Sequence, residues 1–192
     1  MNNPFMAVYN VCIMTQEPQP KILFSRKEIN TAVNRLARAI TRDYSGKHPV
    51  IISILKGSFV FTADLIRLLD FPLEVEFIRL SSYGKEKQSS GKIDLVQGLH
   101  IPIKGREVLV VEDIVDTGRT LTYLLNYLND MGPASLKLCA LTDKPSRRQV
   151  PVKIDYLGFT VPNKFIVGYG IDWDEKYRHL PNICVIEEEL SE

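Results

Sequence analysis

The sequence has almost no excess of charge of either sign. Its 192 residues include 24 Lys and Arg against 23 Asp and Glu, which gives a formal net charge of +1. A protein that holds a long nucleic-acid backbone needs a surplus of cations. Nucleic acid is therefore disfavoured as the main partner, and only a small, local anion site remains open.

Cysteine and long apolar runs are also scarce. The three cysteines, Cys12, Cys139 and Cys184, lie far apart and include no CxxC pair, which argues against a disulfide framework or a zinc site. No apolar run approaches the ~18 residues of a membrane span, and the start "FMAVYNVCIM" lacks the basic flank and the cleavage site of a signal peptide. We expect a cytoplasmic protein with reduced thiols and no membrane partner.

Two common nucleotide motifs are missing. There is no GxxxxGK[ST], and no GxGxxG follows an expected strand, which excludes a P-loop kinase and a dinucleotide oxidoreductase. What is present is the composition of a folded globular protein, with 45% hydrophobic and 24% charged residues. We expect residues 1–20 to form an N-terminal tail and residues 21–192 to form a single domain.

Strands and helices alternate along the chain. Ser25 and Glu28 form a capping-box pattern before apolar residues at helical spacing, which predicts a helix over 25–44. The β-branched run 49–55 predicts a strand that is buried on both faces. The same patterns predict strands over 73–83, 106–113, 134–141 and 154–161, helices over 58–69 and 119–131, and short strands around an irregular turn in 165–189. We therefore expect an α/β fold with a mainly parallel sheet, and ligands beyond the carboxyl ends of its strands.

The segment "VLVVEDIVDTGRTL", Val108 to Leu121, joins an apolar strand to a helix. In its Asp-Thr-Gly-Arg-Thr turn, backbone N–H groups and two hydroxyls would point at one spot, where the helix dipole adds positive potential; this predicts a phosphate cradle. Glu112 and Asp113 would repel that phosphate unless they bind a ribose diol and a divalent cation. The alternative is that Asp116 only caps the helix while the acidic pair is solvated. The contiguity of these parts favours a sugar phosphate bound with Mg²⁺.

This segment resembles the 5-phosphoribosyl-1-pyrophosphate motif of type I phosphoribosyltransferases. Four more stretches follow in the order found in hypoxanthine-guanine phosphoribosyltransferases, namely Leu55–Ser58, Leu80–Gly84, Asp143–Arg148 and Asn163–Pro181. The similarity covers about residues 22 to 188. It implies the type I phosphoribosyltransferase fold, a mainly parallel twisted sheet flanked by helices, with a small hood from the N-terminal helix region and the C-terminal segment.

The resemblance also implies an activity. The family transfers phosphoribose from 5-phosphoribosyl-1-pyrophosphate to hypoxanthine or guanine, with Mg²⁺, giving IMP or GMP and pyrophosphate in purine salvage. The transition state has oxocarbenium character, so most of the catalysis is electrostatic stabilisation of the charge that develops in it. Family members are usually dimers or tetramers, and we expect a homodimer or homotetramer.

Residue roles for the phosphoribosyl half of the substrate follow from the resemblance. The 5′-phosphate would be held by Asp116, Thr117, Gly118, Arg119 and Thr120. Glu112 and Asp113 would hold the ribose hydroxyls, directly or through metal. Asp116 is also the candidate general base for the purine N7 proton, because a carboxylate facing a partly dry pocket can have its pKa raised.

The pyrophosphate would be held by a loop at Lys56 and Gly57, where the family often has a non-proline cis peptide. Arg178 would be a second pyrophosphate contact. A lid over about Ser82 to Lys92 would exclude water from the reaction centre, with Ser82 and Tyr83 as its contact residues. A charged surface loop is the simpler explanation of that segment, but its position in the family pattern and its polar composition together favour the lid.

The purine would be recognised mainly by Lys144, which would donate to O6, a contact that adenine cannot reproduce. The remaining purine roles fall to Phe165, which would stack on the ring, Ile114 on the other face, the main chain of Ile166 at the O6 and N1 edge, and Asp172, which would coordinate a second Mg²⁺. Without the resemblance, core packing is the better explanation of Phe165.

Three alternatives stay open. One is a regulator that keeps the phosphoribosyl pyrophosphate motif as a sensor without catalysis, although the near-neutral charge and Lys144 argue against it. Another is a preference for xanthine, which differs from the other bases only at the 2-position. The order of hypoxanthine and guanine is not fixed by side-chain identity either.

Overall fold

The structure is a computed structural model that describes residues 19–82 and 93–186. The tail expected over residues 1–20 therefore lies almost wholly outside the described residues. Among the helices that are described, none has both the length and the apolar character needed to cross a membrane.

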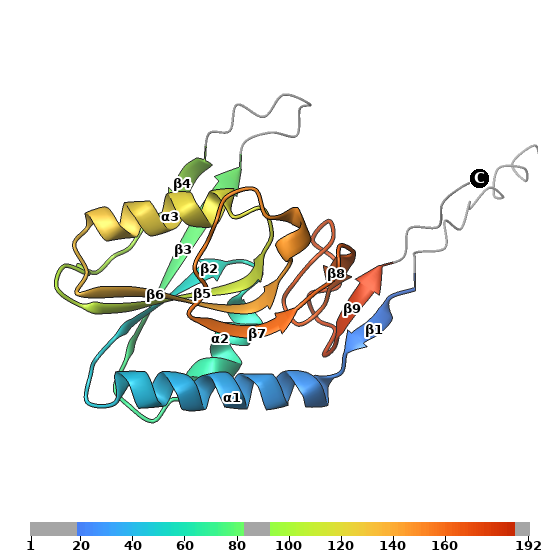
Figure 1. The fold of residues 1–192 in the computed structure, drawn as a ribbon, viewed down its shortest axis with the longest axis horizontal. Helices are drawn as coiled ribbons and strands as arrows, with labels where there is room; N and C mark the ends of the chain where they lie inside the picture. The colour runs from blue at the N-terminus through green and yellow to red at the C-terminus, as the bar shows by residue number, and fades with distance from the viewer. Residues whose placement is uncertain (1–18, 83–92, 187–192) are drawn as a thin grey trace, which may run out of the picture.

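A six-stranded sheet forms the centre of the molecule (Figure 1). In spatial order its strands are β4 (Ile93–Gln97), β3 (Glu74–Ser82), β2 (Val50–Leu55), β5 (Glu107–Val115), β6 (Ser135–Asp143) and β7 (Tyr156–Thr160). All neighbouring strands are parallel except the antiparallel pair β3 and β4. The expected α/β fold with a mainly parallel sheet is confirmed.

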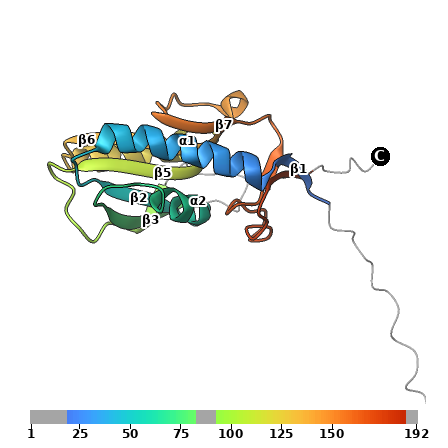
Figure 2. The ribbon, with the colours of Figure 1, turned by 90° about the horizontal axis from the view of Figure 1, so that it is seen from below.

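Helices cover both faces of this sheet. Figures 1 and 2 show α1 (Arg26–Tyr44) and α2 (Phe59–Ile66) on one face, and Figure 1 shows α3 (Arg119–Asp130) on the other. The capping box that begins α1 is present: the Ser25 N–H donates to the Glu28 carboxylate at 2.8 Å, and the Ser25 side chain accepts from the Glu28 N–H. Helix α2 ends three residues earlier than the sequence predicted.

The apolar runs of the central strands divide between two cores. Successive side chains of a strand point to opposite faces, so in β5 Leu109 packs with the residues of α1 and α2, while Val108 packs with those of α3. Cys139 and Leu138 of β6 divide in the same way. Burying a side chain of this size contributes about 1.5–3 kcal/mol, so both faces of the sheet are needed to hold the strands at fixed positions.

A small antiparallel sheet lies beyond the carboxyl end of β7 (Figure 1). It contains β1 (Lys21–Phe24), β9 (Ile183–Ile186) and β8 (Phe165–Val167), with β9 in the middle. Strand β1 was not predicted from the sequence, because four residues carry no usable periodicity and their partner lies at the other end of the chain.

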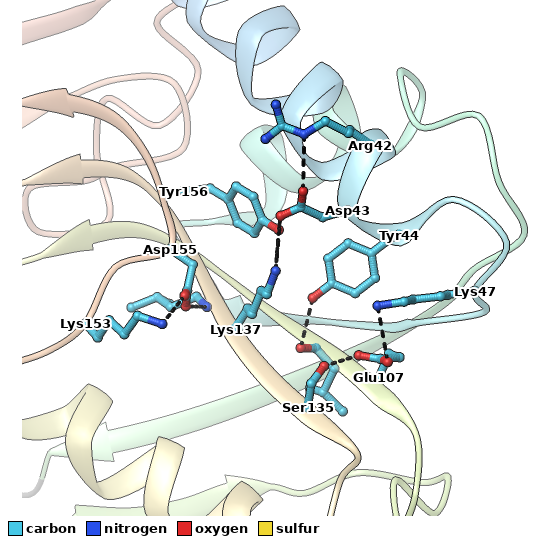
Figure 3. A network of polar contacts seen from close by, with 12 residues as sticks. Arg42, Asp43, Tyr44, Lys47, Glu107, Ser135, Lys137, Lys153, Asp155 and Tyr156 are labelled. Carbon is cyan, nitrogen blue, oxygen red and sulfur yellow. Dashed lines mark hydrogen bonds and ion pairs between the residues drawn. The ribbon is translucent and has the colours of Figure 1, made fainter.

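A polar network ties the end of α1 to the amino ends of the central strands (Figure 3). We call Asp43, Glu107, Ser135, Lys137 and Tyr156 the basal network. Lys137 Nζ lies 3.1 Å from both Asp43 Oδ2 and the Tyr156 hydroxyl, which itself donates to Asp43 at 2.7 Å. The hydrogen bonds from Tyr156 and Lys137 lower the pKa of Asp43 to about 2, and that from Ser135 lowers the pKa of Glu107.

Candidate active site

The expected pyrophosphate loop joins β2 to α2. A buried hydroxyl cluster holds its base: Ser53 Oγ lies 2.8 Å from both the Ser58 and the Thr62 hydroxyls, and Ser58 donates to the Ile54 carbonyl at 2.6 Å. The peptide bond between Leu55 and Lys56 is cis. The Lys56 side chain is 46% exposed, so it lies at the surface of the loop.

Three segments meet at Gly57 without room for a side chain. A Cβ atom on Gly57 would overlap the carboxylate of Asp113. A Cβ atom on Gly170, whose φ is 101°, would overlap the Gly57 carbonyl. The expected pyrophosphate loop is thus in direct contact with the acidic end of β5 and with the C-terminal segment.

Among the described residues, Glu112 and Asp113 form no ion pair with a Lys, Arg or His side chain. Glu112 Oε2 is inaccessible to solvent and makes no hydrogen bond among the described residues. Burial, and then the charge of Asp113, raises the pKa of Glu112 well above its ordinary range. Burial also raises the pKa of Asp113 to about 6, although backbone hydrogen bonds and Arg178 act in the opposite direction. The pair would gain from a bound cation or from hydroxyl donors.

The acidic pair could hold Mg²⁺ together with a substrate. In the described part of the chain, no group of three His, Cys, Asp or Glu side chains is placed to hold a metal. Protein-bound Mg²⁺ often takes just one or two carboxylates and completes its shell with phosphate oxygens and water. The acidic pair fits that pattern, because Glu112 Oε2 is buried and finds no hydrogen-bond partner in the part of the chain that the structure describes.

The turn from Asp116 to Thr120 has the shape that a phosphate cradle needs. Gly118, with φ 84°, is the N-cap of α3, and a Cβ atom there would overlap the Val150 carbonyl. The Thr117 carbonyl is held by the N–H groups of Gln149 and Val150 at 2.9 and 3.1 Å. Because α3 begins at the next residue, its first N–H groups have no partner within the helix and face the turn.

Lys144 and Asp116, both expected near the purine, lie close enough for their charges to interact. Lys144 is only 6% exposed and donates from Nζ to the Lys164 carbonyl at 2.9 Å. Burial lowers the pKa of Lys144, while the charge of Asp116 acts to raise it. Asp116 Oδ1 lies 3.2 Å from Arg147 Nε as an ion pair but makes no aligned hydrogen bond within the described chain.

The remaining residues expected at the purine differ in exposure. Phe165 is 53% exposed, so core packing, the better explanation from the sequence alone, is wrong for this ring. Ile166 is buried and belongs to the core under α1 and α2, which leaves its main chain for recognition. Ile114 is half-buried against the same core.

The C-terminal segment brings a four-membered ion cluster to the loop. Arg178 Nη2 lies 2.8 Å from Asp172 Oδ1 and 3.1 Å from Glu175 Oε2, and Nη1 donates to the Gly170 carbonyl at 2.9 Å. Lys56 Nζ lies 3.0 Å from both carboxylate oxygens of Glu175. Both cations expected to hold pyrophosphate therefore share one carboxylate.

Some residues of the site were not predicted from the sequence, and some predicted residues lie outside the described part of the chain. Glu175 and Arg147 were not predicted as site residues, because their partners Lys56 and Asp116 are distant in sequence. Gly168 and Gly170 were a sign in the sequence that another segment approaches this backbone closely. Of the expected lid, Tyr83 lies outside the described residues. For Ser82 only the backbone, as the end of β3, is described.

Known proteins share the sequence and the fold of this chain. The phosphoribosyl transferase domain family matches residues 22–174, so the chain belongs to the phosphoribosyl transferase family. The hypoxanthine-guanine phosphoribosyltransferase of Streptococcus pneumoniae is 45% identical over 177 residues, which are 92% of this chain and 98% of that protein. The bifunctional protein TilS/HprT of Listeria monocytogenes is 42% identical over 170 residues, and the chain spans only 26% of its length.

A solved structure agrees with the sequence relatives. The crystal structure of a hypoxanthine-guanine phosphoribosyltransferase from Bacillus anthracis, with HEPES in its active site, matches with a TM-score of 0.84 at 44% identity and covers 89% of this chain and 100% of that one. Within the family, the chain thus groups with hypoxanthine-guanine phosphoribosyltransferases, and the resemblance seen in its motifs is confirmed.

Proposed function

We propose that this protein is a purine-salvage enzyme. It transfers phosphoribose from 5-phosphoribosyl-1-pyrophosphate to N9 of hypoxanthine or guanine, with Mg²⁺ as cofactor, and releases IMP or GMP and pyrophosphate. The observation that carries the proposal is the contact of Gly57 with Asp113. This contact supports the proposal, because a pyrophosphate bound at Gly57 would leave next to ribose hydroxyls bound at Asp113.

In the proposed reaction the chain binds the substrate mostly by charge. The backbone of the turn from Asp116 to Thr120, with the Thr117 and Thr120 hydroxyls, holds the 5′-phosphate, and the acidic pair holds the ribose hydroxyls. Lys56 and Arg178 stabilise the charge that develops on pyrophosphate as it leaves. Mg²⁺, when bound at the acidic pair or at Asp172, would supply further positive charge to the pyrophosphate oxygens.

The purine is oriented by the opposite wall of the site. The Lys144 ammonium has three N–H donors, of which one donates to the Lys164 carbonyl, so two remain for O6 of a 6-oxopurine. The exposed ring of Phe165 stacks on the base, and Asp116 accepts the N7 proton. Ile114 and the main chain of Ile166 complete the contacts.

We also propose that the enzyme works in the cytoplasm as a homodimer or homotetramer, without a nucleic-acid or membrane partner. Size-exclusion chromatography with light scattering measures its oligomeric state.

The test of the main proposal is a spectrophotometric assay with Mg²⁺, phosphoribosyl pyrophosphate and each of hypoxanthine, guanine, xanthine and adenine. We expect fast nucleotide formation with hypoxanthine or guanine and none with adenine. Saturable binding of phosphoribosyl pyrophosphate without turnover of any base would instead support a sensor. Dominant turnover of xanthine would correct the substrate class.

A further inference from the structure

Glu175 occupies the two cations that the proposed function assigns to pyrophosphate. Its carboxylate accepts from Lys56 Nζ with both oxygens at 3.0 Å and from Arg178 Nη2 at 3.1 Å. We propose that Glu175 is an internal competitor of pyrophosphate, which has to leave these cations when the anion binds and which returns when it is released. The inference rests on the proposed function and adds to it a residue that sets pyrophosphate affinity.

The charges of the cluster balance without a ligand. Lys56 and Arg178 supply two positive charges, and Asp172 and Glu175 supply two negative ones, all within ion-pair distance of a partner. An arriving pyrophosphate brings several negative charges to the same cations. Because like charges cannot share these contacts without repulsion, one carboxylate must move away.

Exposure decides which carboxylate moves. The side chain of Glu175 is 64% exposed, whereas that of Asp172 is 30% exposed. Asp172 is also held by the Glu175 N–H, which donates to its Oδ2 at 2.8 Å. Glu175 can therefore swing into water at little cost, while Asp172 stays in place.

The turn that carries Glu175 has an uncommon backbone. Asp174, Glu175 and Tyr177 all have left-handed φ angles, at 51°, 62° and 70°. Reciprocal hydrogen bonds between the backbones of Trp173 and Lys176, at 3.2 and 3.0 Å, close this turn. Backbone of this kind persists only where the surroundings hold it, and it clusters at ligand clamps and switch regions. Here it places the Glu175 carboxylate against Lys56, 119 residues away in the chain.

The test compares Glu175→Gln with Asp174→Asn in the full chain. Each substitution removes one negative charge from the same turn and keeps the side-chain length, but Asp174 makes no ion pair within the described residues. Isothermal titration calorimetry with magnesium pyrophosphate at 0.15 M salt gives the Kd, under conditions where charges beyond about 8 Å are largely screened. Steady-state kinetics with hypoxanthine gives the KM values of both substrates.

We expect Glu175→Gln to lower the Kd of pyrophosphate and the KM of phosphoribosyl pyrophosphate by about 2- to 10-fold, the combined effect of two exposed ion pairs. The KM of hypoxanthine and the melting temperature should stay unchanged, and Asp174→Asn should match the wild type. The inference is overturned if Glu175→Gln leaves the Kd of pyrophosphate unchanged, or if Asp174→Asn changes it equally. In either case, turnover by the wild type would leave the proposed function standing. Wild-type protein that neither turns over nor binds pyrophosphate overturns both.

Discussion

The two ends of strand β5 treat their acidic residues in opposite ways. At the amino end, Glu107 accepts from Ser135 and pairs with Lys47 at 3.4 Å, and its pKa is lowered. At the carboxyl end, Glu112 and Asp113 form no ion pair within the described part of the chain, and burial raises the pKa of each. The protein satisfies its own acids at one end of the sheet and leaves those at the other end for a ligand.

The two ends of the sheet differ because different elements pack against them. The last turn of α1 brings Asp43 over the amino ends of β6 and β7, where Lys137 and Tyr156 meet it. The carboxyl ends are reached by loops instead, and those loops present Gly57 to Asp113. We infer that acids in the basal network add to stability, whereas the acidic pair lowers stability in exchange for binding.

The largest effect is expected from Asp116→Asn, directly after the carboxyl end of β5. Removal of a general base should slow turnover by about 10²-fold or more while the fold and the binding of phosphoribosyl pyrophosphate are kept. Stopped assays with hypoxanthine measure the rate, and calorimetry measures the binding. Turnover near the wild-type rate would remove Asp116 from this role.

Lys144→Ala should mainly damage the use of 6-oxopurines. Loss of the O6 donor should lower kcat/KM for hypoxanthine by about 10- to 100-fold and leave the Kd of phosphoribosyl pyrophosphate unchanged. Circular dichroism and thermal melting provide the control, because the substitution also leaves the Lys164 carbonyl without this donor. A variant that unfolds would show that Lys144 is structural.

Asp113→Asn should change how stability depends on pH. The pKa of Asp113 is raised from 3.8 to about 6 in the folded state, so between these pH values the folded protein binds more protons than the unfolded one. The free energy of unfolding therefore falls as the pH rises from about 4 to about 6. Discounted for partial exposure, the loss is about 1–2 kcal/mol. Urea unfolding from pH 4 to pH 7 should show this decline in the wild type and less of it in the variant; identical curves would contradict the prediction.

Asp43→Asn tests the amino end of the sheet, where the shift in pKa has the opposite sign to that of Asp113. The pKa of Asp43 is lowered from 3.8 to about 2, so its contribution to stability is present above about pH 4 and is lost as the pH falls towards 2. The variant should lose about 1 kcal/mol at neutral pH and keep its turnover. Asp130→Asn, at an exposed acid without an ion pair in the described chain, is the control. A loss of activity in Asp43→Asn without a loss of stability would break the comparison.

Much of the fold could be predicted because its signals are local. The capping box at Ser25, the β-branched run of β2 and the apolar stripe of α3 each lie within one element, and each formed as expected. Pairings across the chain could not be predicted in this way. Strand β1 and the contact of Glu175 with Lys56 depend on residues that the fold alone brings together.

The candidate site divides along the same line. The turn from Asp116 to Thr120 is contiguous in sequence, so its strand–turn–helix geometry was readable in advance. The approach of Gly57 to Asp113 and Gly170 joins three distant segments, and only a lack of space in three dimensions shows it. The roles of these residues stay predictions until the variants are measured.

The pairing of β1 with β9 has a consequence for the nascent chain. Lys21 pairs with Val185, so the first strand of the described chain leaves the ribosome long before its partner is made. At about 5–20 residues per second, the wait is roughly 10–30 s. The central sheet can be assembled during that time, while the small sheet, and with it the order of Phe165 and the segment up to Arg178, must wait until β9 has been made. A chain that stops before β9 would then keep the turn from Asp116 to Thr120 and lack the ordered segment that carries Phe165.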